Sequence, residues 1–555
     1  MFMRDRVKIL SFALAILTAG ALPSPAQEAT EYVGGRQAAA NQVVVKLRSG
    51  SRLSVAKLRR LYDLDRMRRI GNSEVYVLHS RSRSAGAMLR SLGSRQDVAY
   101  VEPDYLLHAT SLPNDPRFGE QWALQNNGQS ILGSPGTPGA DIGAVYAWDV
   151  TTGAGGPVVA LLDTGVDATH PDLAANIWSA SAEFSVKIGN RTLTCAQGSH
   201  GFDAIRNTCD PVDDNGHGTL VAGIIGAVGH NGEGVSGVNQ QASMLPVKFL
   251  NSRGTGTTSN FVNAIDFLIQ VKQMGVANVR VISNSWGGNS NSRAMMDAVS
   301  RALENDILFV SAAGNLSENT DTSPFYPASL PLPNVLAVTA TDHHDQLMSS
   351  ANVGPNSVHV GAPGAFILST IPGGDYDYSS GTSMAAAYAA GTATLMLAGC
   401  PDLNALDART VLVESAQPTA SLTGQTISGG RVHADNAIKK CNVPAFTMST
   451  TPATVEIAQG GTASITVQIA PTGGFSDTVF LGVSGGYPEA LFSYVSGVVT
   501  PPASDTLTIR NTLNIPLGTY LFSITGTAGD VVRTAPLWVV ITRAVKGNPQ
   551  SSPGH

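Results

Sequence analysis

Hydrophobic and polar positions divide the chain into three regions with different periodicities. Between residues 43 and 109, apolar runs alternate with amphipathic stretches, and this predicts a small α+β unit. We expect its strands at 43–47, 74–80 and 98–109 and its helices at 54–64 and 85–93. From about residue 114, apolar runs alternate with longer helical stretches. After residue 441, short segments alternate strictly between apolar and polar positions.

The apolar runs of the middle region predict a parallel sheet that is buried on both faces, because nearly every position in them is apolar. These runs lie at 158–163, 244–250, 279–286, 307–314 and 335–341, and helices are expected between them, for example at 258–274 and 293–305. Alternating strands and helices indicate an α/β three-layer sandwich. The strands expected at 462–469, 506–510, 519–526 and 535–542 indicate an all-β, Ig-like sandwich, followed by a disordered tail at 546–555.

The N-terminus has the pattern of a secretory signal peptide over residues 1–26. Arg4, Arg6 and Lys8 precede an apolar run at 9–22, and small residues follow at 23–26. The alternative is a retained membrane anchor, but this run is shorter than the roughly 20 residues that a span needs. We therefore expect export to the periplasm, the cell surface or the medium, and no membrane span after processing.

Composition narrows the class of protein further. Only 14% of residues are charged and the net charge is −6, which argues against a nucleic-acid partner. The charge is uneven, with a net of +7 over residues 43–110 and −14 over residues 111–555. A basic segment that is joined to an acidic one indicates that the two regions dock.

The four cysteines of the chain predict disulfides, because an even number in an exported protein is typical of paired cysteines. The sequence alone allows three connectivities. Pairing Cys195 with Cys209 closes a short local loop, and Cys400 with Cys441 then ties a helix end to a later segment. Metal ligation is the alternative, but no close C-x-x-C spacing supports it.

Three motifs in the middle region carry groups that are suited to nucleophilic catalysis. Asp163 ends an apolar strand, at the sheet edge where α/β enzymes bind ligands. His217 lies between glycines just before an apolar helix, and Ser383 opens a helix of small residues. Taken singly, these are ordinary positions for a turn aspartate, a structural histidine and a capping serine.

Together, the three residues have the order Asp, His, Ser, which is one of the known orders of an acyl-transfer triad. His217 would take the proton from Ser383, and Asp163 would orient the imidazole and stabilise its charged form. Asn315 follows another strand in FVSAAGN, where its amide could donate a hydrogen bond to an oxyanion.

The segments DTGVDATHPDL, NGHGTLVAG, NSWGG, AAGN and GTSMA resemble those of the subtilisin family of serine proteases, the subtilases, over residues 110–441. The resemblance implies an inhibitor-type propeptide at 27–110 and a peptidase domain at 111–441. The alternating strands that follow predict a separate β-sandwich domain at 442–545. It implies an exported serine endopeptidase that acts on polypeptides and cuts off its own propeptide between Leu107 and Asn114. We expect a monomer without an organic cofactor.

The resemblance also implies two binding regions. Ser285, Trp286 and Gly287 resemble the edge strand that pairs with the substrate backbone, and Ala312, Ala313 and Gly314 resemble a wall of the main specificity pocket. These segments carry no charge, which favours apolar or aromatic side chains before the scissile bond. A structural calcium ion is implied as well. Its ligands would be Asp172, the side chain of Asn231 and the backbone carbonyls of Gly229, Glu233 and Val235.

The chain departs from the family pattern in three places. Ala387 and Tyr388 stand where Pro-His is common, and Leu220 stands where His is common after His-Gly-Thr. The spacing from Asp163 to His217 is long because of an insertion that holds Cys195 and Cys209. The alternatives to a protease are a catalytically inactive binding protein, an adhesive surface protein whose β-domain carries the function, and an esterase or acyltransferase. The intact triad argues against the first, and the peptide-pairing strand argues against the last.

Overall fold

A computed structural model of the chain describes residues 30–33, 36–48, 55–71, 74–105, 112–472, 475–485, 491–510, 512–529 and 531–543. The predicted signal peptide, the tail and most of the expected cleavage segment lie outside these residues. The chain forms two compact units, which divide near residue 106. No helix in the described ranges is long and apolar enough to cross a membrane.

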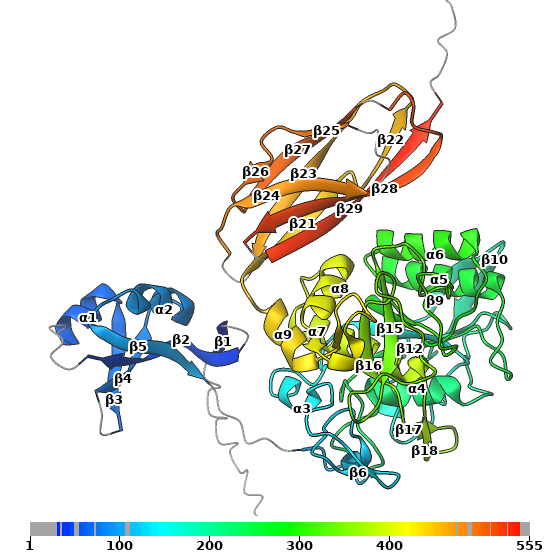
Figure 1. The fold of residues 1–555 in the computed structure, drawn as a ribbon, viewed down its shortest axis with the longest axis horizontal. Coiled ribbons are helices and arrows are strands. Elements are labelled where there is room, and N and C mark those ends of the chain that lie inside the picture. Colours follow the sequence, from blue (N-terminus) through cyan, green and yellow to red (C-terminus); the bar gives the residue numbers. More distant parts are fainter. Residues whose placement is uncertain are drawn as a thin grey trace, which may run out of the picture. The chain divides into compact units, whose positions relative to one another are not determined.

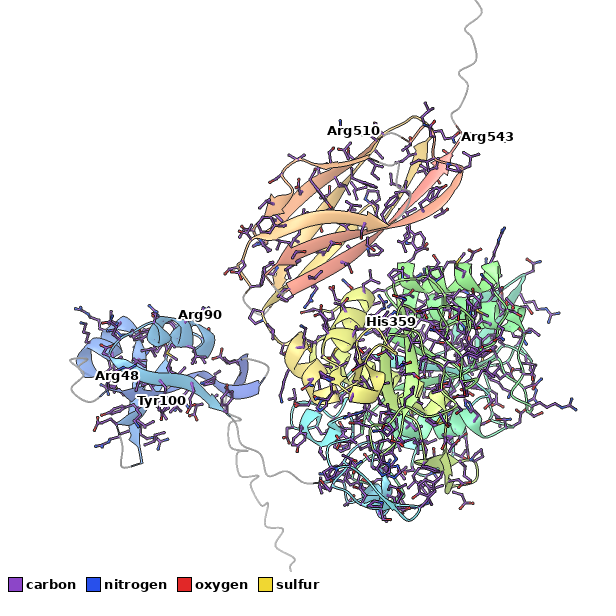
Figure 2. All side chains as sticks on the ribbon, in the orientation of Figure 1. Arg48, Arg90, Tyr100, His359, Arg510 and Arg543 are labelled. Atoms are coloured by element: carbon purple, nitrogen blue, oxygen red, sulfur yellow. A yellow bond between two sulfur atoms is a disulfide. The ribbon has the colours of Figure 1, made fainter. Side chains whose placement is uncertain are left out.

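The first unit is a five-stranded sheet with two helices (Figure 1). The sheet order is β1-β2-β4-β3, and β5 pairs with β2. The elements are β1 (Thr30–Val33), β2 (Arg36–Leu47), α1 (Val55–Leu61), β3 (Leu64–Ile70), β4 (Val75–Ser80), α2 (Ala85–Gly93) and β5 (Val98–Tyr105). Its core includes Val43, Leu58 and Met88. Basic side chains such as Arg48 and Arg90 are exposed on its surface (Figure 2).

The predicted order of this unit was incomplete, because β1 and β3 were not expected and the first helix ends before residue 64. The sequence of β3 is LDRMRRI, and its charged residues leave no alternation of apolar and polar positions that would predict a strand. It lies at the end of the sheet order and pairs with β4 alone, so its charged side chains reach solvent. Charged residues are common on such edges because they discourage pairing with other chains.

The second unit contains a nine-stranded sheet in the order β11-β12-β8-β13-β14-β15-β16-β20-β19. All neighbouring pairs are parallel except β19 with β20. The strands are β11 (Phe202–Asp203), β12 (Met244–Lys248), β8 (Val158–Asp163), β13 (Val279–Asn284), β14 (Leu308–Ala312), β15 (Val335–Thr341), β16 (Val360–Pro363), β20 (Gly430–Arg431) and β19 (Gln417–Pro418). The parallel sheet that the apolar runs predicted is confirmed.

Helices cover both faces of this sheet, and each face has its own core. Along β8, Val159 and Leu161 belong to one cluster with the helices α4 and α7, whereas Ala160 and Leu162 belong to another with α5 and α6. The helices are α3 (Ala144–Ala147), α4 (His217–Gly226), α5 (Thr258–Gln273), α6 (Arg293–Glu304), α7 (Thr382–Gly399), α8 (Ala405–Glu414) and α9 (Ala434–Cys441). The three-layer α/β sandwich is therefore present as expected.

Smaller elements surround the sheet. They are the hairpins β6 (Ser130–Ile131) with β7 (Ser134–Pro135), β9 (Phe184–Ile188) with β10 (Arg191–Cys195), and β17 (Ile367–Ile371) with β18 (Asp375–Ser379), together with 3-10 turns at Phe118–Glu120, Ala174–Asn176 and Ala420–Leu422. The β9–β10 hairpin belongs to the insertion between Asp163 and His217.

After α9 the described chain is all-β. One sheet has the order β21-β23-β27-β25 and the other β22-β29-β28-β24-β26, with a shared apolar core between them. The strands are β21 (Ala445–Thr451), β22 (Thr454–Ala458), β23 (Ala463–Thr472), β24 (Val479–Gly485), β25 (Leu491–Tyr494), β26 (Val498–Val499), β27 (Ala503–Arg510), β28 (Gly518–Ala528) and β29 (Val531–Thr542). The β-sandwich architecture agrees with the alternating pattern of the sequence.

Two disulfides join Cys195 to Cys209 and Cys400 to Cys441, with Cα–Cα distances of 5.6 and 6.2 Å. The first closes the insertion on itself. The second ties the end of α7 to the end of α9. Of the three connectivities, the structure has the one with the short local loop.

We predict that the Cys400–Cys441 disulfide stabilises the protein more than the Cys195–Cys209 disulfide. The two bonds span 41 and 14 residues, and the loop-entropy difference is about 1 kcal/mol. Paired Cys→Ser variants, compared by thermal unfolding in an inactive background, should show the larger loss of Tm for the longer loop. An equal or reversed order would show that local strain or solvation outweighs loop length.

Candidate active site

The Asp163 carboxylate lies at the C-terminal end of β8 and is almost completely buried. Its Oδ1 accepts hydrogen bonds from the backbone N–H of Thr164 at 2.8 Å and from Nδ1 of His217 at 2.7 Å. A buried carboxylate needs such donors, because burial removes its hydration. The bond to Nδ1 leaves Nε2 as the ring nitrogen that is free to exchange a proton with another group.

His217 is the first residue of α4, and its side chain is 29% exposed. Gly216 before it has φ of 106°, a conformation that glycine adopts without strain. Burial alone would lower the pKa of His217, but the negative charges of Asp163 and Asp213, with the hydrogen bond to Asp163, outweigh it and raise the pKa above its ordinary value.

Asp213 is a residue that the sequence analysis missed, and it joins the two loops of this pair. Its Oδ1 accepts hydrogen bonds from Thr164 Oγ1, Asn215 N and Gly216 N, and its Oδ2 accepts from N and Oγ1 of Thr219. Burial raises the pKa of Asp213, but these hydrogen-bond donors lower it by a larger amount. The pKa of Asp213 is therefore below its ordinary value. In the sequence it resembled an ordinary turn aspartate.

Lys248 is a second residue that the sequence did not single out. It ends β12 opposite Asp163 in the sheet register and is almost fully buried. Its Nζ donates to the carbonyl oxygens of Thr164 and Leu250 and to Oδ1 of Asp214. The ammonium group therefore fixes the backbone that follows β8.

Ser383 is the second residue of α7, whose N-terminal cap is Gly381. Its hydroxyl donates to the carbonyl oxygen of Ser285 at 2.8 Å, and the hydroxyl of Ser285 donates back to the carbonyl oxygen of Ser383 at 2.8 Å. Among the described residues no hydrogen bond joins Ser383 to His217. Catalytic hydrogen bonds often form only when substrate binds, and the geometry is compatible with a bond between Ser383 and His217 in the substrate complex.

Asn315 follows β14, and its side chain is oriented by the start of α7. Its Oδ1 accepts a hydrogen bond from the N–H of Thr382 at 2.9 Å, and Thr382 Oγ1 accepts from the N–H of Gly314 at 3.1 Å. Because the amide oxygen is engaged by the helix start, the amide nitrogen is left for another acceptor. This arrangement suits stabilisation of a negative oxygen beside Ser383.

The two predicted substrate-binding segments follow neighbouring parallel strands. Ser285, Trp286 and Gly287 follow β13, and Ala313 and Gly314 follow β14, which ends at Ala312. The indole of Trp286 packs against the rings of Phe249 and Phe261, which also contact each other. The segments therefore lie at the same edge of the sheet as Asp163.

The predicted calcium ligands Asp172, Asn231 and Val235 are brought together. Asp172 is fully buried, and its two oxygens accept hydrogen bonds from Asn231 Nδ2 at 2.8 Å and from Val235 N at 2.9 Å. Gly229 and Glu233 lie in the same loop. The Oδ1 of Asn231 accepts a hydrogen bond from Glu233 N, so its amide nitrogen faces Asp172.

A second buried carboxylate, Asp115, approaches the same loop and was missed by the sequence analysis. It accepts hydrogen bonds from the N–H groups of His230 and Asn231. Burial raises the pKa of Asp172, and the nearby charge of Asp115 raises it further. Two close buried carboxylates fit a cation, since one would relieve their repulsion. In the described ranges no cluster of three acidic, His or Cys side chains forms a metal site, so backbone carbonyls would have to complete the set.

Comparison with known families agrees with this geometry. Residues 154–439, more than half of the chain, match the subtilase family model, Peptidase_S8. Residues 24–104 match the model of the fervidolysin N-terminal prodomain. The chain therefore belongs to the subtilase family, and it is a serine endopeptidase with an N-terminal prodomain.

Several curated proteases are similar to the chain. A thermophilic serine proteinase of Bacillus sp. strain AK1 is 35% identical over 63% of this chain and 75% of its own length. Thermitase of Thermoactinomyces vulgaris is 33% identical over 59% of this chain and 99% of its own length. An extracellular protease of Xanthomonas campestris pv. campestris is 32% identical over 72% of this chain and 70% of its own length.

We predict that the imidazolium of His217 titrates above the ordinary histidine pKa of about 6.5. Since Asp163 raises its pKa, Asp163→Asn should lower it. NMR titration of ring-labelled histidine in an inactive variant would measure both. His433 is the internal control, because burial lowers its pKa to about 4. A pKa of His217 that does not respond to Asp163→Asn would contradict the described pair.

Proposed function

We propose that the protein hydrolyses polypeptides through an acyl-enzyme formed on Ser383, with Asp163 and His217 completing the triad. The observation that carries this proposal is the 2.7 Å hydrogen bond between Asp163 and His217, at the sheet edge where Ser383 lies in the first turn of α7. Asp163 holds His217 in the tautomer whose Nε2 can accept a proton.

In the proposed reaction, the hydroxyl of Ser383 turns from the carbonyl of Ser285 to Nε2 of His217 as substrate binds. Its oxygen attacks the scissile carbonyl carbon while its proton passes to His217. The carbonyl oxygen becomes negative and is stabilised by Nδ2 of Asn315 and the N-terminus of α7. His217 then protonates the amine as the scissile C–N bond breaks, which leaves the acyl group as an ester on Ser383. A water molecule gives a proton to His217 and attacks this ester, and the proton returns to Ser383 as the C–O bond breaks and the carboxylic acid leaves.

The substrate backbone would lie along Ser285, Trp286 and Gly287 as an added strand. Main-chain hydrogen bonds of this kind give affinity without selecting a side chain. This supports a polypeptide substrate over a small ester. The catalytically inactive alternative is disfavoured because the triad residues and Asn315 are all present. The adhesive alternative would rest on the β-sandwich, which carries no recognised ligand motif.

We also propose that the enzyme removes its own prodomain and is exported, with the prodomain acting as an inhibitor until it is degraded. The net charges of +7 over residues 43–110 and −14 over residues 111–555 support docking of the two regions. Export is supported by the signal-peptide pattern and by the two disulfides. The site of removal would lie between Leu107 and Asn114.

Calcium is proposed as a structural ion held by Asp172, Asn231 and the carbonyls of Gly229, Glu233 and Val235, with Asp115 as a further oxygen donor. Asn231 would have to turn its amide so that the oxygen faces the ion. A bound cation would neutralise the buried carboxylates and tie residue 115 to the 229–235 loop.

We predict that Ser383→Ala abolishes peptide hydrolysis and leaves the chain uncut. The matched control Ser181→Ala, an exposed serine of the insertion, should process and cleave like the wild type. Casein hydrolysis and N-terminal sequencing of both proteins would test this. Processing of the Ser383→Ala chain in a protease-free expression system would show that self-cleavage is not the route.

We predict that chelation by EDTA lowers Tm and that excess calcium restores it. A ligand at 100 times its Kd stabilises by about 2.7 kcal/mol. Asp172→Asn should remove the response to calcium, while Asp402→Asn, an exposed carboxylate elsewhere, should keep it. Thermal unfolding in the Ser383→Ala background would avoid self-digestion. Identical Tm values with EDTA and with calcium would show that the protein holds no stabilising calcium ion.

A further inference from the structure

The ring of Phe325 lies between the two substrate-binding segments. A Cβ atom placed on Gly287 would be 2.2 Å from Cε1 of Phe325, and one placed on Gly314 would be 3.0 Å from Cδ1 and Cγ of the same ring. Gly287 belongs to the strand that follows β13, and Gly314 to the segment that follows β14. One aromatic side chain therefore contacts both walls, on the side where each wall lacks a side chain.

Backbone hydrogen bonds hold this ring in place. Tyr326 exchanges two of them with Gly288, at 2.7 and 2.8 Å, so the chain beside Phe325 is paired with the substrate strand. The N–H of Phe325 donates to Ser329 Oγ at 3.0 Å, and the N–H of Ser329 donates to the carbonyl of Phe325 at 2.9 Å. The ring is thus attached to a fixed turn rather than to a loose loop.

A substrate side chain that enters between these walls would meet the ring. Phe325 is half-buried, so part of its surface reaches solvent. Gly287 and Gly314 have no side chains, and the ring of Phe325 takes up the space beside both of them. A short side chain would fit in front of this ring, whereas a second aromatic ring would have to displace Phe325.

We propose that Phe325 closes the main specificity pocket, and that the enzyme cleaves after small residues such as Ala and Ser in preference to Phe and Tyr. This proposal rests on the proposed peptide hydrolysis and names the substrate side chain for the same site. This preference for small residues differs from the preference for apolar or aromatic residues that the sequence analysis inferred from the uncharged walls. That expectation considered the walls alone, and the ring between them comes from a different loop.

The test compares tetrapeptide p-nitroanilides that differ only in the residue before the scissile bond: Ala, Leu and Phe. The wild type should have its highest kcat/KM with Ala. Phe325→Ala should raise the ratio of kcat/KM for Phe over Ala at least tenfold, since a single methylene group in an apolar pocket is worth about 10- to 200-fold. Phe325→Leu should give an intermediate ratio. The control Phe480→Ala removes an exposed ring of the β-sandwich and should leave the ratio unchanged.

Binding separates this proposal from the proposed chemistry. Calorimetric titration of the Ser383→Ala protein with the tetrapeptide acids ending in Ala and in Phe needs no turnover. Tighter binding of the Ala peptide, reversed by a further Phe325→Ala change, supports the pocket even if hydrolysis fails. An aromatic preference in the wild type, or a preference that does not change in either Phe325 variant, overturns it.

Discussion

A buried carboxylate at the end of a parallel strand needs hydrogen-bond donors, and the site is built around this requirement at Asp163. Its oxygen receives the N–H of the next residue and Nδ1 of His217. To deliver that imidazole, α4 has to begin beside the end of β8. Asp213 accepts one hydrogen bond from Thr164, after β8, and four from residues 215–219 at the start of α4, so it joins the two loops. Lys248 fixes the backbone beyond the strand. The orientation of His217 therefore depends on contacts that several loops make.

The same sheet edge positions the other half of the site. The starts of α7 and of the segment after β14 are joined through Thr382, which donates its N–H to Asn315 and accepts from Gly314. Ser383 and Ser285 exchange hydrogen bonds in the same way. The proposed nucleophile, the proposed amide donor and the proposed peptide-pairing strand are thus linked by hydrogen bonds before any substrate arrives. Such preorganisation is a main source of enzymatic rate enhancement.

The sequence predicted the parallel sheet and the location of Asp163, His217, Ser383 and Asn315, because strand ends and helix starts are local features with strong patterns. It predicted that the four cysteines form disulfides, but it left three connectivities open. It did not predict β3, because the many charged residues of this edge strand mask the alternation that is typical of a strand. Asp213, Asp115 and Phe325 were missed for another reason. Each acts through contacts with residues that are distant in the chain or in another loop, and periodicity carries no information about such contacts.

We propose that Asp163, His217 and Ser383 act as one catalytic unit. The most direct test is labelling of the folded enzyme with a fluorophosphonate, which reacts with an activated serine, followed by mass-spectrometric mapping of the adduct. We predict one adduct, on Ser383, that forms rapidly in the wild type and is lost in His217→Ala. Labelling of a different serine, or equal labelling of Ser383 with and without His217, would contradict it.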